Sequence, residues 1–336
     1  MSIHLLQSRR QFLRQLGVLA VWPAVDALPV HASAAETHGG VTVPAIVPVT
    51  LAPGVYCIVS PWGFPSPENL GMMSNVTFLT TQNGVVVIDS GSSRQIGEMA
   101  LRAIRQQTDA PVVAVINTHY HGDHWLGNHA FVAAYPDVPI YAHENTIRAI
   151  KTGQGEYWTS LMDRSTDHAT VGTVVTPPTR PLQHADVLSF GDMTLKIHHY
   201  GTAHTPADIC VEIVERKVVH VGDVAMDRRI ANMDDGSFLG SFKTFDALQA
   251  AVPGALWIPG HGEPSHEVLA SNRQLFEAIY QSAEKAVREG VGPDAAKQFA
   301  LQHPFIRASA SEIKGFDDNI GKYASLAYLE AESAAF

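Results

Sequence analysis

One short stretch of the chain decides how the rest is interpreted. It runs Asn117-Thr118-His119-Tyr120-His121-Gly122-Asp123-His124-Trp125-Leu126-Gly127-Asn128 and follows the apolar run Val112 to Ile116, which predicts a buried strand. Imidazole nitrogens and carboxylate oxygens are ligands that divalent cations such as zinc prefer. A turn directly after a strand can aim His119 and His121 at one point and Asp123 and His124 at a second. A His-rich surface loop is the alternative, but a His-x-His-x-Asp-His pattern behind a strand favours a metal site.

Three more candidate donors stand at the ends of other apolar runs. His204 precedes the run Ile209 to Val214, Asp223 follows Val219 to Val221, and His261 follows Leu256 to Pro259. Each is weak evidence alone. A divalent ion takes about four to five donors, so the first motif needs ligands from elsewhere. The same position at a strand end makes these three the expected ones.

The order of predicted elements indicates an α/β (α+β) fold made of two mixed halves, each burying one sheet against the other. In the first half we expect strands at 54–60, 75–80, 84–89, 112–116 and 138–142, with helices at 94–107, through Phe131, and from Glu144. In the second half we expect strands at 187–189, 194–199, 209–214, 217–221 and 256–259 and a helix at 244–251. Residues 156–182 join the halves without periodicity, which predicts a long loop.

The two ends of the chain are expected to differ from this core. After Pro264 an i, i+3, i+4 apolar pattern predicts a helix up to Gly290, followed by further helices to the C-terminus. We therefore divide the chain into residues 1–34, a catalytic domain at 50–264 and a C-terminal helical extension at 265–336.

The N-terminal residues resemble an export signal. Ser8-Arg9-Arg10-Gln11-Phe12-Leu13-Arg14, a short apolar stretch and Ala32-Ser33-Ala34 are typical of a twin-arginine signal peptide with its cleavage site, here residues 1–34. We expect a periplasmic protein. The apolar stretch is too short for a permanent membrane anchor. An uncleaved anchor or a chance basic amphipathic start is the alternative.

Composition limits the partners. The chain has 336 residues, 46% of them hydrophobic, and a formal net charge of −10. Such acidity argues against nucleic acid or an anionic membrane as partner, so we expect a small-molecule substrate; the sequence leaves the oligomeric state open. Cys57 and Cys210 lie in different predicted strands. An oxidising compartment permits a disulfide, but we favour two buried thiols.

Over residues 54–264 the motifs resemble the metallo-β-lactamase superfamily. That resemblance implies a four-layer αβ/βα sandwich with two metal ions in a cleft at one sheet edge. It also implies the ligands: His119, His121 and His204 for one ion, Asp123, His124 and His261 for the other, and Asp223 with a hydroxide as the bridge between them. Asp89 matches an early aspartate that lies behind the metal loop in the family. The alternative, a helix N-terminal cap, is compatible with that role.

The residue at position 223 separates branches of the family. True β-lactamases carry Cys or Ser where this chain has Asp223, whereas glyoxalase II-like hydrolases and lactonases carry Asp. The exported start and the helical tail also resemble a quinoprotein-relay and sulfur-oxidation-associated branch of zinc hydrolases. We therefore expect little β-lactam turnover.

The resemblance predicts a hydrolase. A metal-bridging hydroxide would attack an ester, thioester, lactone or lactam, and Asp123 would orient the hydroxide and take up its proton. Two Zn²⁺ per chain are expected, with iron or manganese as alternatives. Two other functions stay open: a persulfide dioxygenase with a single iron, and a periplasmic metal-binding protein without turnover.

Other side chains have weaker signals. Trp62 and Phe64 form either a small satellite core or a wall of the substrate cleft. Tyr120 and His220 are candidates for hydrogen-bond partners of metal-bound imidazoles. The remaining histidines are expected to be surface or core residues: His129, His143, His198, His199, His266 and His303.

Overall fold

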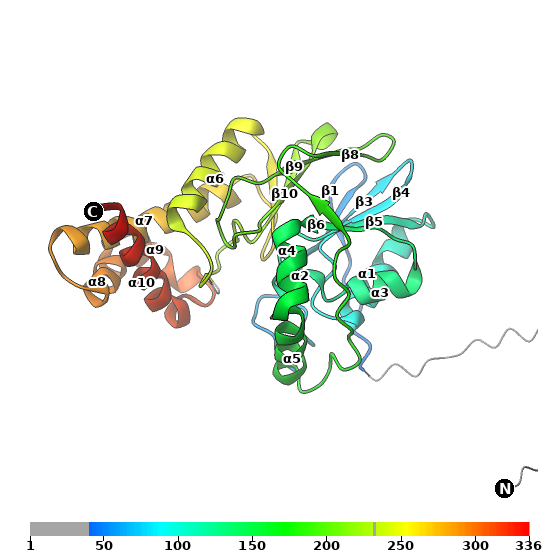
Figure 1. Cartoon of the computed structure of the whole chain (residues 1–336), viewed down its shortest axis with the longest axis horizontal. Coiled ribbons are helices and arrows are strands. Elements are labelled where there is room, and N and C mark those ends of the chain that lie inside the picture. Colours follow the sequence, from blue (N-terminus) through cyan, green and yellow to red (C-terminus); the bar gives the residue numbers. More distant parts are fainter. Residues whose placement is uncertain (1–39, 231–232, 336) are drawn as a thin grey trace, which may run out of the picture. The chain divides into compact units, whose positions relative to one another are not determined.

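Two β-sheets face each other at the centre of the computed structural model, which describes residues 40–230 and 233–335 (Figure 1). The predicted export signal at 1–34 lies outside the described residues. The first sheet has the strand order β1-β2-β3-β4-β5-β6-β7 and the second has β12-β11-β10-β9-β8. Helices cover the outer face of each sheet, so the predicted four-layer αβ/βα arrangement is confirmed.

The strands of the first sheet are β1 (Val49–Ala52), β2 (Val55–Ile58), β3 (Val76–Thr81), β4 (Gly84–Ile88), β5 (Val112–Ile116), β6 (Ile140–His143) and β7 (Arg180–Leu182). Strands β1 to β4 pair antiparallel, and β4 to β7 pair parallel. Because β4 and β5 are parallel neighbours, their carboxyl ends meet at one edge. Asp89 and the metal loop after Ile116 therefore start side by side.

The strands of the second sheet are β8 (Val187–Ser189), β9 (Thr194–His198), β10 (Cys210–Ile213), β11 (Val218–Gly222) and β12 (Leu256–Pro259). Strands β11 and β12 run parallel, with Gly222 opposite Pro259. Asp223 and His261 each follow one of these strands within two residues. The parallel pairing thus brings the two side chains to the same edge.

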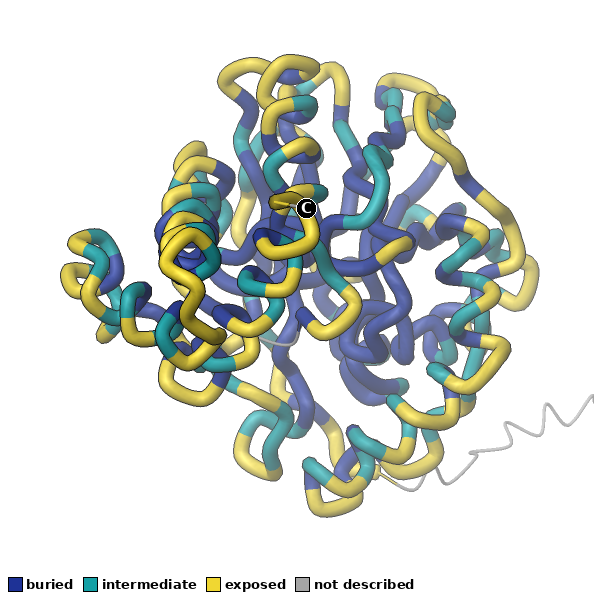
Figure 2. Tube along the Cα trace, turned by 60° about the vertical axis from the view of Figure 1, so that its left-hand side comes forward, coloured by how far each residue is buried: buried dark blue, intermediate teal, exposed yellow. Residues whose placement is uncertain are grey.

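Apolar side chains fill the space between the sheets. Ile88 and Ile116 of the first sheet and Ile197 and Val211 of the second belong to one cluster and are fully buried. Alternate residues of a strand face this layer, for example Val86 and Ile88 in β4 and Leu195 and Ile197 in β9. Figure 2 shows the central strands buried and the outward turns of the helices exposed.

The helices are α1 (Arg94–Gln107), α2 (Gly122–Trp125), α3 (Asn128–Ala134), α4 (Glu144–Ala149), the π-helix η1 (Ile150–Gln154), α5 (Gly155–Ser165), the 3₁₀-helix η2 (Val214–Arg216), α6 (Phe238–Ala251), α7 (Val268–Arg288), α8 (Pro293–Gln302), α9 (Pro304–Ser309), the 3₁₀-helix η3 (Ala310–Glu312) and α10 (Phe316–Ala335). Helices α1 and α3 pack on the outer face of the first sheet. Helices α6, α7, α8 and α10 share a cluster with the outer face of the second. None of the helices in the described part of the chain is both long and apolar enough to cross a membrane.

Two local predictions were wrong. Residues 156–182 are not one loop, because they contain most of α5 and the edge strand β7. Helix α6 begins at Phe238 rather than at Thr244, since the Ser237 side chain accepts a hydrogen bond from the Gly240 N–H and caps it. The alternative interpretation of Asp89 as a helix cap does not apply, because Ser93 caps α1.

The two cysteines are buried free thiols, as favoured. Cys57 is in β2 and Cys210 in β10, on different sheets. Burial raises the pKa of the Cys57 thiol to about 12, so this group is an unreactive apolar filler rather than a nucleophile.

We expect Ile197→Ala to lower the free energy of unfolding by about 2–5 kcal/mol, because it leaves a cavity between the two sheets. Val187→Ala is the control, since Val187 lies on the edge strand β8 and is 56% exposed; it should cost less than about 1 kcal/mol. Urea unfolding of both variants measures this. Equal losses would contradict the assignment of Ile197 to the layer between the sheets.

Candidate metal centre

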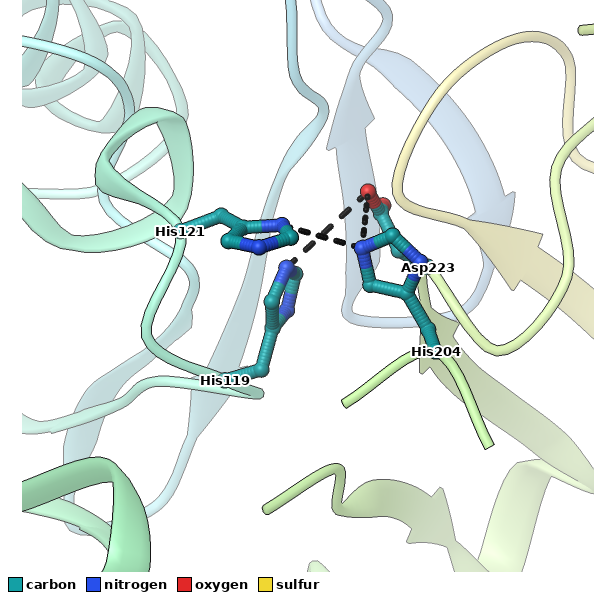
Figure 3. A group of neighbouring side chains, drawn as sticks. All are labelled: His119, His121, His204 and Asp223. Carbon is teal, nitrogen blue, oxygen red and sulfur yellow. Dashed lines mark hydrogen bonds and ion pairs between the residues drawn. The ribbon is translucent and has the colours of Figure 1, made fainter. Parts of the chain in front are cut away.

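The seven predicted donors converge where strands of both sheets end. His119 and His121 come from the turn after β5, His204 from the loop after β9, and Asp223 from the end of β11. Figure 3 shows these four side chains pointing toward one another, with His119 and His121 on one side and His204 and Asp223 on the other. Sequence position alone placed them at strand ends; the topology brings them to one edge.

The donor atoms fall into two groups, in each of which they lie within 4.8 Å of one another. One group is His119, His121, His204 and Asp223, and the other is Asp123, His124 and His261. In the first group His204 Nε2 lies 2.9 Å from His121 Nδ1 and 3.5 Å from Asp223 Oδ2. The first contact is a hydrogen bond between two imidazoles and the second is an imidazole–carboxylate pair, so these donor atoms are close enough together to act as ligands of one cation.

Asp223 faces both groups. Its Oδ1 lies 3.3 Å from His124 Nε2, and its Oδ2 lies 3.2 Å from His261 Nε2 and 3.9 Å from His119 Nε2. In the second group the Asp123 carboxylate is 3.3 Å from His124 Nε2 and 3.2 Å from His261 Nε2. Asp223 is therefore the one carboxylate of the seven donors that can reach an ion in either group.

Hydrogen bonds behind the imidazoles fix which nitrogen faces the cleft. Asp89 accepts hydrogen bonds from the Thr118 N–H at 2.8 Å, from the Thr118 hydroxyl at 2.9 Å and from His124 Nδ1 at 2.8 Å. His119 Nδ1 lies 3.0 Å from the Thr118 hydroxyl, and His261 Nδ1 donates to the Met73 carbonyl oxygen. Each of these histidines is thus held with Nε2 toward the cleft, as metal-binding imidazoles are.

The donor set fits divalent cations. His119 Nε2, His124 Nε2 and Asp223 Oδ1 are buried and make no well-directed hydrogen bond among the described residues, although His124 Nε2 and Asp223 Oδ1 lie 3.3 Å apart as an ion pair. Buried polar atoms without a partner are costly, so they call for a ligand. One donor group offers three imidazole nitrogens and a carboxylate, and the other offers two imidazole nitrogens and a carboxylate. Both sets suit zinc, iron and manganese.

The two groups differ electrostatically. Burial lowers the pKa of His119 well below its usual value, and burial lowers that of His204 to about 3, so both are neutral and ready to bind a cation. Burial acts in the same direction on His124, but Asp123, Asp223 and Asp89 outweigh it and hold the His124 pKa well above its usual value. The His261 pKa is raised in the same way, chiefly by Asp223 against burial.

Four weaker predictions have mixed outcomes. His220 does lie behind the site, with Nε2 3.3 Å from Asp89 Oδ2. Tyr120 does not hold an imidazole; its hydroxyl donates to Asp235 at 2.9 Å. Trp62 and Phe64 are not among the residues that line the cavity beside His204 and Asp223. They lie over Arg228 and Arg229, at 5.8 and 4.8 Å from ring centroid to guanidinium carbon, and their place as a wall of the substrate cleft stays a prediction.

Sequence reasoning missed two features of this site. The Thr118 hydroxyl bonds both Asp89 and His119 and so links them. The signal for this was present, because Thr118 stands inside the motif directly before the ligand His119. Arg229 lines the cavity beside His204 and Asp223. The only signal for it in the sequence is the pair Arg228-Arg229 in an otherwise acidic chain.

Comparison with known proteins agrees with this geometry. A family model described as the metallo-beta-lactamase superfamily matches residues 70–303, which include all seven donors. The linear primary-alkylsulfatase of Pseudomonas sp. (strain ATCC 19151) is 23% identical over 252 residues, which are 63% of this chain. The chain spans 47% of the length of that relative.

Solved structures show the same fold. The metallo-beta-lactamase from Pontibacter korlensis matches with a TM-score of 0.56 and 19% identity over 68% of this chain and 98% of its own. The metallo-beta-lactamase from Hirschia baltica matches with a TM-score of 0.54 and 19% identity over 69% of this chain and 98% of its own. Together with the family match and the clustered donors, this likeness establishes that the chain belongs to the metallo-β-lactamase superfamily of metallo-hydrolases.

Proposed function

We propose that this protein is a zinc-dependent hydrolase that holds two ions per chain, one in each donor group. The observation that carries the proposal is the position of Asp223, whose two oxygens face His124 in one group and His204 in the other. A bridging carboxylate of this kind suits two adjacent ions better than one. His119, His121 and His204 would hold the first ion, and Asp123, His124 and His261 the second.

Two divalent cations would lower the pKa of a water molecule and polarise the bond to be broken. The chain then has to orient the water and accept its proton. We assign both roles to Asp123. Its carboxylate is one of the seven donors, and His124 holds its pKa well below the usual value despite burial, so it is ionised and can accept a hydrogen bond from the water. So low a pKa makes it a weak base, which suits orientation of the water more than storage of its proton. Neither cysteine is placed to act as a nucleophile, because Cys57 and Cys210 are buried in the sheets.

For the substrate we propose an ester, thioester, lactone or lactam, with β-lactams as poor substrates because position 223 is Asp. A sulfate ester is the second candidate. It is supported by the match to a protein named as a linear primary-alkylsulfatase. We also propose the periplasm as the compartment, on the N-terminal sequence alone.

Two alternatives make different demands on the site. A persulfide dioxygenase would need one iron, which leaves one of the two donor groups without a role. A metal-binding protein without turnover would have no need for Asp123 as a proton acceptor. Both are tested by metal content together with activity.

We expect Asp223→Ala to bind about one ion instead of two and to lose at least about 100-fold in turnover, because both donor groups lose a shared ligand. Loss of a residue that only hydrogen-bonds to a metal ligand already lowers metal affinity or activity about 10–100-fold. Asp137→Ala, at an exposed carboxylate before β6, is the control. Metal analysis, circular dichroism and a substrate panel measure this. The panel contains nitrocefin, S-lactoylglutathione, a homoserine lactone, an aryl ester and an aryl sulfate. Full activity and both ions in Asp223→Ala would contradict the bridging role.

We expect the ion held by Asp123, His124 and His261 to be lost first as the pH falls. A raised pKa means that His124 and His261 take up protons at a higher pH, and bound protons compete with the cation. His119 and His204, with lowered pKa values, stay neutral further into acid.

Metal content after equilibration at decreasing pH measures this order, with His261→Ala as a variant that lacks a ligand of the acid-sensitive group. The wild type should lose its ions in two steps, and His261→Ala should show only the second. Loss of both ions in a single step in the wild type would contradict the assignment.

A further inference from the structure

Glu330, near the end of α10, holds the beginning of α6. Its Oε2 accepts hydrogen bonds from the backbone N–H groups of Phe238 at 2.8 Å and of Leu239 at 3.2 Å. These two residues open α6, and N–H groups in the first turn of a helix have no acceptor within it. A carboxylate at this end also interacts favourably with the helix dipole. The last helix of the chain therefore fixes the start of α6.

Aromatic packing supports the same junction. Phe238 is fully buried, and its ring lies edge-on to that of Tyr323 in α10, with 5.9 Å between the ring centroids. The Phe238 ring also lies 5.0 Å from that of Phe276 in α7. Aromatic pairs at such distances stabilise a contact beyond the area that they bury. The start of α6 is thus held by α7 and α10 together.

The start of α6 in turn supports the loop that carries His204. The Ser237 N–H donates a hydrogen bond to the Ala203 carbonyl oxygen at 2.8 Å. The first turn of α6 also lies directly against this loop, since a Cβ at Gly240 would be 1.8 Å from the Thr202 carbonyl oxygen. Only glycine permits so close an approach. The two residues before His204 therefore both rest on the first turn of α6.

This line of contacts ends in one donor group and not in the other. His204 is a donor of the first group, with His119, His121 and Asp223. The donors of the second group stand on the metal loop after β5 and on the turn after β12. Because Ala203 directly precedes His204, a shift of the start of α6 is passed to this ligand. The first group should therefore respond more than the second.

We propose that Glu330 is a positioning residue of the metal centre: it fixes the start of α6 and thereby holds His204 in place for the first ion. The inference rests on the proposed two-ion hydrolase and makes the C-terminal helical extension part of its site. Glu330 lies beyond residues 70–303, the part of the chain that the family model matches. The support for His204 thus comes from outside the matched region.

A cap that only stabilises α6 makes a different prediction. Its loss would lower the stability of the fold and would weaken the binding of both ions alike, or of neither. A positioning role predicts that zinc affinity falls in the first donor group alone, in a protein that stays folded. The ratio of the two zinc affinities therefore separates the two roles.

The test titrates the full chain with zinc in competition with a chelating dye. It compares Glu330→Ala and Glu330→Gln with the control Glu332→Ala. Glu332 lies in the same helix and is exposed, and its carboxylate accepts a hydrogen bond from the Tyr328 hydroxyl at 3.3 Å. His261→Ala, which lacks a ligand of the second group, identifies which of the two affinities belongs to the first. Circular dichroism checks the fold.

Hydrogen exchange followed by mass spectrometry gives a second readout, which does not depend on zinc. In Glu330→Ala the exchange should be faster in residues 201–205 and 236–241, because the start of α6 no longer holds the loop. It should stay unchanged in the metal loop, residues 117–125.

Glu330→Ala should lower the zinc affinity of the first group about 3- to 10-fold. This is less than the loss of about 10- to 100-fold for a direct hydrogen-bond partner of a ligand, because Glu330 acts through α6. The affinity of the second group should stay within about twofold, as for sites without shared partners. Glu330→Gln keeps an acceptor oxygen and should recover most of the affinity, and Glu332→Ala should match the wild type.

Equal losses in both groups would overturn the positioning role, as would an unchanged first affinity alongside faster exchange at the start of α6. If Glu330→Ala fails to fold, Glu330→Asp takes its place with the same expected ratio, because its shorter side chain withdraws the carboxylate from α6. A selective loss in a wild-type background that binds two zinc ions but hydrolyses no substrate of the panel would reject the hydrolase proposal and support the role of Glu330. Hydrolysis by the wild type with equal losses in Glu330→Ala would do the reverse.

Discussion

The structure depends on one constraint: seven ionisable side chains are buried together at the edge where the two sheets meet, and their charges must be balanced there. Asp123 and Asp223 balance His124 and His261, and Asp89 balances His124 from behind. His119 and His204 remain neutral because burial lowers their pKa values. Orphaned donor atoms remain even so, which is why the arrangement is a place for cations rather than a closed ion-pair network.

The fold supports this edge from both sides. The parallel pairs β4–β5 and β11–β12 bring Asp89, the metal loop, Asp223 and His261 together at their carboxyl ends. The apolar layer between the sheets holds the two pairs at a fixed separation. Ligand position is therefore a consequence of strand pairing and sheet packing rather than of the loops alone.

Much of this was predictable because it is local in sequence. Strand runs such as Val112–Ile116 and helix α1 show their periodicity directly, and the donors stand next to them. The short edge strand β7 was missed because it depends on pairing with β6. The start of α6 was missed because it is set by the Ser237 cap. Neither feature shows in the spacing of apolar residues. The position of Arg229 beside the donors was missed because it depends on its bond to Gly63 and on the pairing of its backbone neighbours with Lys314, both remote along the chain.

The most direct test of the account is the position and identity of the metal in crystals of the protein purified with its native metal. Anomalous scattering at the zinc edge should give two peaks per chain. One should lie among His119, His121 and His204 and the other among Asp123, His124 and His261, with Asp223 in contact with both. A single iron peak, with one of the two donor groups holding no ion, would contradict the central claim.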